Sequence, residues 1–404
     1  MNLFSSEKAQ VLLLASAQAL FQTIAVMVMT LSGLVGLRLA SDKGLATLPI
    51  AMMMVAAAVT MIPAAMLMQK FGRRAGFLLG TAAGCLAGVV AAVAIWLESF
   101  GWFVVANMLV GVYQGFAQYY RFAAADIASA DFKSRAISWV IAGGVFAAMA
   151  GPTLARLTQG LGAIPFVAAY LSLAVVSLLA LVIVSRLQMP AMLKSVEQGH
   201  ARPILVIMRQ PTFLTAVIGS SVGAAVMVMV MTATPLAMQM CGQNLGSAAS
   251  VIQWHVLGMF LPSFFTGRLI QRFGVLPVMS SGIALLSVHT VIAFNGTTFL
   301  HFLSGLTFLG IGWNFLFIGG TNLLTESYSP SERAKTQAAH DFLMSAAVSL
   351  ASLSAGGILN AWGWHSVNLT VLPFLLLALC AVLGLMWQRR RVPSRAGDVQ
   401  LKII

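Results

Sequence analysis

The segment AMLMQKFGRR, residues 65–74, ends one long apolar run, and the similar segment GRLIQRFGVL, residues 267–276, ends another. Their shared pattern of Gln, a basic residue, Phe and Gly begins at Gln69 and returns 202 residues later at Gln271. The tripeptide SRA at 134–136 likewise returns 198 residues later as ERA at 332–334. Both separations are close to half of the 404-residue chain, which indicates a duplicated unit.

Twelve apolar segments of membrane-spanning length follow one another along the chain. A spanning helix needs about 20 mostly apolar residues. Runs of this kind cover residues 11–37, 45–69, 76–97, 101–125, 136–159, 164–185, 212–240, 247–270, 275–294, 299–325, 336–358 and 367–388. The pattern predicts an all-α polytopic membrane protein with 12 transmembrane helices in two pseudo-symmetric six-helix halves.

The distribution of positive charge predicts which ends of these segments face the cytoplasm. Of the 23 Lys and Arg residues, 20 fall at the N-terminus, in the even-numbered loops or in the C-terminal tail; Arg38, Lys43 and Arg156 are the exceptions. Cytoplasmic loops retain Lys and Arg, so we expect a multi-pass protein of the cell inner membrane with both termini cytoplasmic. The same bias accounts for the net charge of +13 without a nucleic-acid partner.

Composition and loop lengths agree with this arrangement. Hydrophobic residues make up 59% of the chain and charged residues 8%, whereas a soluble domain carries about 25% charged residues. We expect residues 1–185 to form the N-terminal half, 186–211 a cytoplasmic linker, 212–388 the C-terminal half and 389–404 a basic cytoplasmic tail. Membrane lipid surrounds such a chain, and we expect it to work as a monomer.

The loop after the second segment of each half resembles a motif of the major facilitator superfamily of membrane transporters. That motif runs roughly Gly-x-x-x-Asp-Arg/Lys-x-Gly-Arg-Arg/Lys, and Gly72, Arg73 and Arg74 match its end. The second copy keeps Arg272 and Gly274, while Gln replaces the Asp in both copies. The resemblance covers essentially the whole chain and implies a secondary carrier that works by alternating access.

The resemblance also implies that these basic loops close the cytoplasmic side. Gly suits a tight turn, and the Arg side chains can dock on carboxylates or helix C-termini of neighbouring spans. Asp126 and Glu326, at the cytoplasmic ends of segments four and ten, are the candidate acidic partners. His340 and Asp341 form a further candidate gate pair. Ordinary topology signals explain each single Arg equally well.

In the superfamily, the first span of each three-helix repeat lines the central cavity, which corresponds here to segments one, four, seven and ten. Polar and aromatic residues follow helical stripes on three of these segments. The predicted substrate-binding residues are Gln18, Gln22, Asn107, Tyr113, Gln114, Gln118, Trp313, Asn314 and Phe317. Amides that face lipid lose their hydrogen bonds, so the stripes face either a wet cavity or neighbouring helices.

Two local resemblances bear on the substrate. The segments YYRFAAAD (119–126) and ERAKTQAAHDF (332–342) resemble a bacterial permease branch that includes riboflavin importers. Uptake of riboflavin or a similar small, largely neutral solute is therefore our first expectation. Gly151 and Pro152 are the core of a motif common in exporters, which makes a drug or metabolite exporter of the proton antiporter type the alternative.

Neither an enzyme nor a cofactor site is expected. The chain has no Walker-type phosphate loop, and its three cysteines and six histidines show no metal-binding spacing. Coupling to protons would have to run through His255, Asp341, or the neighbourhood of Arg121 and Asp126. Because Gly111 occupies the superfamily's Arg position in segment four, the residues favour facilitated movement without coupling.

Overall fold

The computed structural model describes residues 6–129, 132–189 and 202–391. Nearly all of these residues are helical, which confirms the predicted all-α class. Most of the predicted linker, residues 190–201, and the tail from residue 392 lie outside the described residues.

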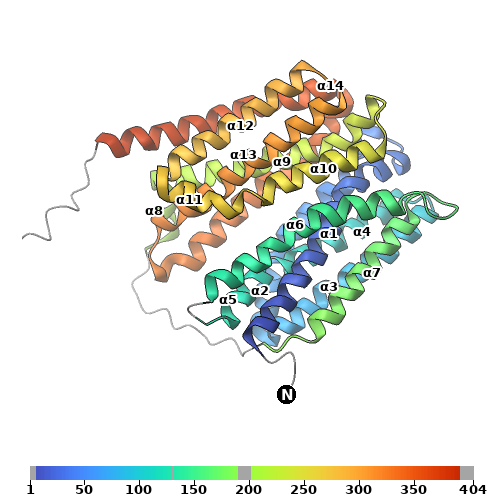
Figure 1. The fold of residues 1–404 in the computed structure, drawn as a ribbon, viewed down its shortest axis with the longest axis horizontal. Helices are drawn as coiled ribbons and strands as arrows, with labels where there is room; N and C mark the ends of the chain where they lie inside the picture. The colour runs from blue at the N-terminus through green and yellow to red at the C-terminus, as the bar shows by residue number, and fades with distance from the viewer. Residues whose placement is uncertain (1–5, 130–131, 190–201, 392–404) are drawn as a thin grey trace, which may run out of the picture.

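The helices of the first half form one bundle, drawn blue to green in Figure 1. They are α1 (Glu7–Leu39), η1 (Lys43–Leu45), α2 (Leu48–Phe71), α3 (Arg73–Trp96), α4 (Phe100–Ala117), α5 (Tyr120–Ile127), α6 (Lys133–Thr158) and α7 (Val167–Ser185). The first helix begins at a standard cap, since the Ser6 hydroxyl accepts a hydrogen bond from the backbone N–H of Ala9.

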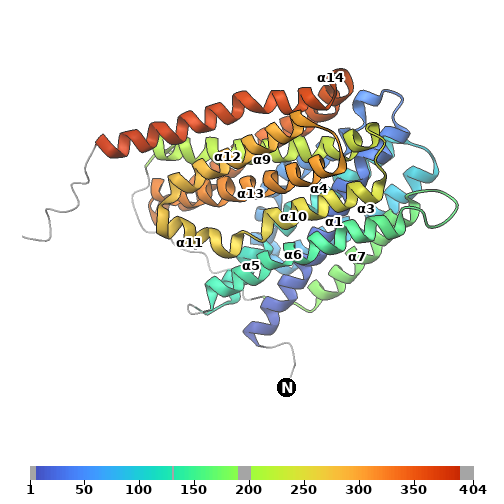
Figure 2. The same cartoon turned by 45° about the horizontal axis from the view of Figure 1, so that its top comes forward.

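The second half forms the other bundle, and Figure 2 shows the same separation from a second side. Its helices are α8 (Ile204–Met208), α9 (Pro211–Met240), α10 (Leu245–Phe260), α11 (Ser263–Phe273), α12 (Val275–Asn295), α13 (Phe299–Leu324), η2 (Thr325–Ser327), η3 (Pro330–Glu332) and α14 (Arg333–Arg391).

Some spans are broken or joined compared with the predicted segments. Segment four divides into α4 and α5, and segment eight divides into α10 and α11 with a bend of 42°. That bend lies at Pro262, whose nitrogen cannot donate to the helix ladder. Segments eleven and twelve appear as α14, which contains a non-helical Gly363 with φ 78°.

The helix α14 folds back at Gly363. Near its start, Lys335 donates to the carbonyl of Arg202, and near its end Arg389 binds Glu326, so both ends lie at the same end of the bundle. Ten described helices are long and apolar enough to cross a membrane, or eleven if α10 and α11 form one bent span. Counting α14 twice then gives twelve crossings.

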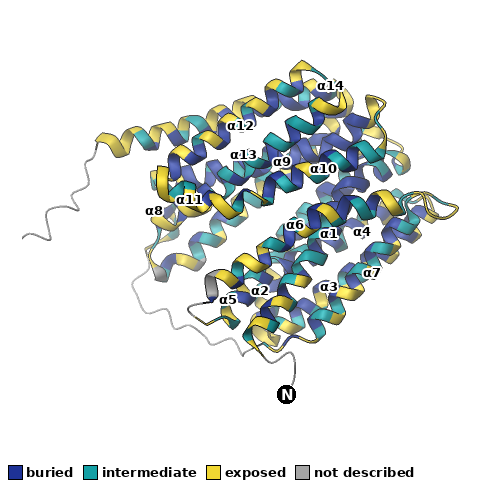
Figure 3. Cartoon of the chain, in the orientation of Figure 1, coloured by how far each residue is buried: buried dark blue, intermediate teal, exposed yellow. Residues whose placement is uncertain are grey.

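Large apolar side chains cover the outer surface of the bundles. Ile62, Phe146, Leu179, Leu350 and Leu376 are all more than half exposed, and Figure 3 shows exposed positions along the outward faces of the helices. A soluble protein does not leave such an extensive apolar surface in water. These faces suit the hydrocarbon of a bilayer, in which helices satisfy their own backbone groups.

Two ends of the bundle are distinguished by charge. We call the end that carries Arg73, Arg272 and Arg389 the basic end, and the end that carries Arg38 and Gly363 the opposite end. The sequence predicts that the basic end faces the cytoplasm.

The two halves touch each other towards the opposite end. Gly33 of α1 packs against Leu236 of α9, and Thr47 before α2 packs against Gly356 of α14. All ion pairs between described residues join partners within one half. The structure is therefore held together at the opposite end by apolar contacts, while charged contacts at the basic end stay within each half.

Candidate functional site

The repeated loop has the same backbone conformation in both halves. Gly72 has φ 87° and ψ 155°, and Gly274 has φ 87° and ψ 160°. Side chains with a Cβ are essentially excluded from this region of backbone space. Each glycine joins two successive spans directly, which explains why the pattern needs glycine at both positions.

The Arg residues of the first loop dock on a carboxylate and on a helix end. Arg73 donates to Asp126 at the end of α5. Arg74 donates to the carbonyl of Ser185, the last residue of α7, at 2.6 Å. A cation at that place satisfies a terminal carbonyl and opposes the negative end of the helix dipole.

The second loop lacks this arrangement. Glu326, the predicted acidic partner of the second loop, binds Arg389 at 2.6 Å and forms no ion pair with that loop among the described residues. The guanidinium of Arg272 instead lies 5.2 Å from the centre of the Phe273 ring. The cause is the fold-back of α14, which brings the basic end of the last span next to η2.

Four glutamine side chains, on α1, on α4 and directly after α4, make no hydrogen bond to the described residues. Gln18, Gln22, Gln114 and Gln118 are half-buried, and within the described parts of the chain their amides make no hydrogen bond. An amide that is removed from water without a partner costs on the order of 1–3 kcal/mol in proteins. These groups therefore belong beside water or a bound polar solute rather than beside lipid.

An aromatic pair on α13 offers a flat apolar surface. The rings of Trp313 and Phe317 are stacked at 4.9 Å with an interplanar angle of 12°, and Phe260 of α10 meets Trp313 edge-on at 6.4 Å. The indole Nε1 of Trp313 is buried and finds no acceptor among the described residues. Stacked aromatic rings with a free donor suit a planar ligand that carries acceptors.

Two of the predicted binding residues lie inside the N-terminal half. Asn107 is 1% exposed, accepts from the Ser32 hydroxyl at 2.9 Å and donates to the carbonyl of Phe103. Tyr113 is fully buried and packs edge-on against Phe21 at 5.0 Å. Both residues connect helices of one bundle. The helical periodicity in the sequence is the same for a residue packed between helices and for one that lines a cavity.

Asn314 holds the break between α10 and α11. Its amide donates to the carbonyl of Met259 and to the Ser263 hydroxyl, both at 2.7 Å, and its carbonyl accepts from Thr266 at 2.7 Å. The side chain is 1% exposed. All three partners flank Pro262, so Asn314 compensates the backbone disruption that this proline causes.

His255 joins two helices of the C-terminal half. It is fully buried, and its Nδ1 donates to the carbonyl of Leu306 of α13 at 2.8 Å. Its Nε2 has no partner within the described residues. A second ring proton would therefore be buried without an acceptor, which makes this histidine a poor site for proton binding.

Two polar clusters contain residues that the sequence did not assign to the site, namely Arg202, Glu332 and Ser220. Glu332 is 1% exposed and binds Arg202 through two bonds of 2.7 Å, and the Arg202 guanidinium holds the pKa of that carboxyl well below its usual range. Ser220 and His340 form the other cluster, since Ser220 Oγ lies 2.7 Å from His340 Nε2. A lone serine in an apolar segment gives no signal of this contact in the sequence.

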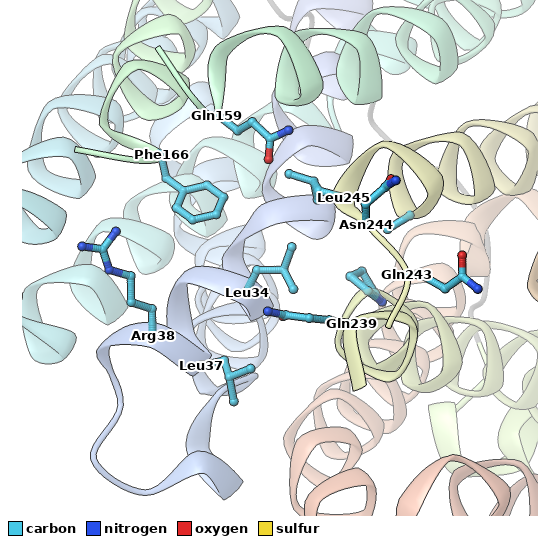
Figure 4. A pocket seen from close by; sticks show the side chains of 11 residues that line it. Leu34, Leu37, Arg38, Gln159, Phe166, Gln239, Gln243, Asn244 and Leu245 are labelled. Atoms are coloured by element: carbon cyan, nitrogen blue, oxygen red, sulfur yellow. The ribbon is translucent and has the colours of Figure 1, made fainter. Parts of the chain in front are cut away.

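A cavity of about 540 Å³ opens between the halves at the opposite end. Figure 4 shows Arg38, Gln159, Phe166, Gln239 and Gln243 around it, supplied by α1, the end of α6, the start of α7 and the end of α9. The contact of α1 with α9 lies beside it, because Leu34 and Pro235 both line the cavity. The cavity is a vestibule next to the place where the halves meet.

Comparisons with known proteins agree with this architecture. A sequence profile of the Major Facilitator Superfamily matches residues 11–252 and 222–402. The chain belongs to the Major Facilitator Superfamily. It is therefore a multi-pass membrane transporter of a small molecule and not an enzyme.

Relatives of known name include carriers from two bacteria. The riboflavin transporter RfnT of Brucella anthropi is 42% identical over 380 residues, which cover 93% of this chain and 95% of that protein. The uncharacterized transporter YdeG of Bacillus subtilis is 29% identical over 348 residues, which cover 82% of this chain and 80% of that protein.

Solved structures of transporters share the fold. A bacterial homologue of the human lysosomal transporter Spinster, in an inward-facing and unoccupied conformation, has a TM-score of 0.74 at 16% identity over 98% of this chain and 100% of that chain. The nucleoside transporter NupG has a TM-score of 0.69 at 14% identity over 94% of this chain and 99% of that chain. At these identities the likeness shows the fold alone.

One departure from the superfamily pattern has a packing cause. Gly111 stands at the position of segment four where the resemblance to the superfamily implies an Arg. A Cβ at this position would lie 2.2 Å from the carbonyl oxygen of Met53, so α4 and α2 approach too closely for any side chain. The close packing of α4 on α2 therefore leaves no room for an Arg side chain at this position.

Proposed function

We propose that this transporter takes up riboflavin or a closely similar compound across the cell inner membrane. The observation that carries the proposal is the 42% identity over 93% of the chain to a riboflavin transporter. The basic end would face the cytoplasm, as the charge distribution predicts. Both termini would then be cytoplasmic, and one chain would suffice for transport.

The chemistry of the candidate site supports this substrate. Riboflavin combines a flat, hydrogen-bonding ring system with a chain of hydroxyl groups and carries no charge at neutral pH. The stacked pair of Trp313 and Phe317 matches the ring. The amides of four glutamines make no hydrogen bond to the described residues and match its carbonyl, imide and hydroxyl groups: Gln18, Gln22, Gln114 and Gln118.

Alternating access gives each contact between the halves a role. With the basic end in the cytoplasm, the packing of Gly33 against Leu236 closes the path from outside, and the vestibule lies just beyond this closed contact. Opening would separate α1 from α9 and join the vestibule to the central site. The repeated loops at Gly72 and Gly274 would then bring the halves together at the basic end.

Export is less well supported. The sequence pointed to it through Gly151 and Pro152, but a Cβ at residue 151 would lie 2.8 Å from Cβ of Val26 and 3.0 Å from the carbonyl of Thr23. Close packing of α6 on α1 therefore explains this glycine in a carrier of either direction.

Growth of a riboflavin auxotroph tests the proposal. We expect the chain to permit growth of a bacterium without riboflavin synthesis or uptake at vitamin concentrations that do not support the empty strain. Trp313→Leu should raise the concentration that is needed, whereas Trp362→Leu, on the exposed surface, should not. Failure of the wild-type chain to support growth, despite normal amounts in the membrane, would refute riboflavin uptake.

A further inference from the structure

The three Lys and Arg residues that depart from the charge bias of the sequence gather around the vestibule. Arg38 lines this cavity. The ammonium group of Lys43 donates to the carbonyl of Leu37, which also lines it, at 2.8 Å. The side chain of Arg156 reaches the start of α10 at the edge of the vestibule, since a Cβ on Gly246 would lie 3.9 Å from its Cδ. The preference for cytoplasmic Lys and Arg does not explain cations at this end.

The carboxylates nearby hold these cations only in part. Glu98 lies 3.7 Å from Arg38, which is too long for a hydrogen bond, and its side chain is 74% exposed. Asp42 accepts from a backbone N–H of η1 at 2.8 Å. Within the described ranges, neither Lys43 nor Arg156 forms an ion pair. An anion in the vestibule would therefore find cations that no carboxylate holds firmly.

Free amides form much of the wall. The side chains of Gln159, Gln239 and Gln243 line the cavity and make no hydrogen bond to other described residues. Figure 4 shows Gln159 on one side of the cavity and the other two glutamines across from it. Their donors and acceptors are of the same kind as those of the four glutamines in the candidate site on α1 and α4.

An aromatic ring is held at the cavity by a strained backbone. Phe166 lines the vestibule with φ 72° and ψ −17°, and its N–H donates to the carbonyl of Gln159 at 2.7 Å. Glu98, the partner of Arg38, is the other non-glycine residue of the described chain with a positive φ, at 52°. Such conformations are rare for residues with a Cβ and gather at ligand sites. Both strained positions border the vestibule.

The cavity has the chemistry that a flat, hydrogen-bonding anion needs. Its volume of about 540 Å³ lies within the range of small-molecule sites, about 300–1,000 Å³. The ring and the amides suit a flavin, and the cations suit a phosphate. We propose that the vestibule binds a flavin that carries a phosphate, and that this ligand keeps the carrier closed at the opposite end. The inference rests on the proposed riboflavin uptake and on a cytoplasmic basic end, which places the vestibule outside.

The position of the cavity explains how a ligand keeps the carrier closed. The N-terminal half supplies Arg38 and Phe166, and the C-terminal half supplies Gln239 and Gln243. Opening would move these two walls apart, because the contact of α1 with α9 lies beside them. A ligand that touches both walls binds the closed state more tightly and raises its population. A phosphorylated flavin in the medium therefore slows riboflavin uptake.

Binding to the purified protein tests the site. Quenching of flavin fluorescence gives dissociation constants for riboflavin and for its phosphate ester, flavin mononucleotide. Arg38→Gln should raise the constant for the mononucleotide about tenfold relative to that for riboflavin, because a hydrogen bond to a charged group is lost. Phe166→Leu should raise the same ratio, whereas Trp313→Leu should lower it. The matched control is Arg268→Gln, an exposed arginine of α11, which should leave the ratio unchanged.

Two results of this titration would overturn the inference. Dependence of mononucleotide binding on Trp313, with no effect of Arg38→Gln or Phe166→Leu, would place the ligand in the candidate site of α13. Full displacement of the mononucleotide by inorganic phosphate at the same concentration would reduce the vestibule to a site for any anion. We expect inorganic phosphate to displace little, because it reaches neither the ring nor the amides.

Uptake of labelled riboflavin by intact cells tests the effect on transport. Flavin mononucleotide in the medium should lower the maximal initial rate, and excess riboflavin should not restore it, because the two ligands bind different states. Arg38→Gln should remove this inhibition. Full restoration by excess riboflavin, or no inhibition of the wild-type protein, would refute the inference. Absence of riboflavin uptake, with mononucleotide binding that still depends on Arg38, would instead refute the proposed function.

Discussion

Replacing Asn314 tests whether its side chain stabilises the fold or binds the substrate. The helical stripe on α13 predicts a binding residue, but the structure joins its side chain to Met259, Ser263 and Thr266. Asn314→Ala removes all three hydrogen bonds and leaves a small buried cavity beside Pro262. We therefore expect a loss of stability and an unchanged affinity for the transported solute.

The size of this loss follows from the contacts. A hydrogen bond contributes about 0.5–1.5 kcal/mol net, and a buried group left without a partner costs about 1–3 kcal/mol. Interhelical bonds in membranes lie near the lower end, at about 0.6 kcal/mol on average. Three lost bonds therefore give about 2 kcal/mol at least, which lowers the ratio of folded to unfolded protein by a factor of about 30.

Thermal unfolding of the purified protein in detergent measures this loss. The matched control is Asn322→Ala, an exposed asparagine on the same helix, which should leave the midpoint unchanged. Counterflow measured on the protein that remains folded should give the wild-type half-saturation concentration. A stable Asn314→Ala protein with a raised half-saturation concentration would show that the amide binds substrate and that its place in the break is incidental.

Three further results are expected. Gly72→Ala should cost about 1–3 kcal/mol in thermal unfolding and slow turnover, because its backbone region excludes a Cβ; Gly101→Ala, which also has open space around it but lies in a helix, should not. Arg202→Gln should destabilise the protein at neutral pH. Because Arg202 lowers the pKa of Glu332, the ion pair stabilises the folded protein fully at pH values above the ordinary carboxyl pKa of about 4.3. The thermal unfolding midpoints of variant and wild type should therefore converge as the pH falls below that value. Trp313→Leu should make riboflavin binding weaker by about 0.5–1.5 kcal/mol, measured as the dissociation constant from quenching of riboflavin fluorescence by the purified protein. An unchanged dissociation constant would exclude the stacked pair from the site.

The spans and the repeated loop were predictable because their signals are local. Apolar length marks a spanning helix, and the backbone conformation at Gly72 and Gly274 is one that glycine alone adopts readily. The docking of Arg73 on Asp126 also followed, since both residues fall at the same end of neighbouring spans.

The partners of buried polar residues were not predictable in the same way. Asn107, Asn314 and the four glutamines share one helical periodicity, but the asparagines bond to neighbouring helices and the glutamine amides make no bond to other described residues. Periodicity predicts which residues share one face of a helix. It does not predict whether that face packs against another helix or lines a cavity. The pairing of Ser220 with His340 joins residues 120 positions apart in the chain, and only the packing of α9 against α14 brings them together.

Counterflow of labelled riboflavin by Gln114→Ala/Gln118→Ala protein tests the central claim most directly. The account predicts that wild-type proteoliposomes preloaded with riboflavin exchange it for labelled riboflavin. Loss of two hydrogen bonds should raise the half-saturation concentration of the double variant about 5- to 150-fold, as about 1–3 kcal/mol implies. Wild-type proteoliposomes that carry no riboflavin, or a double variant with the wild-type half-saturation concentration, would contradict it.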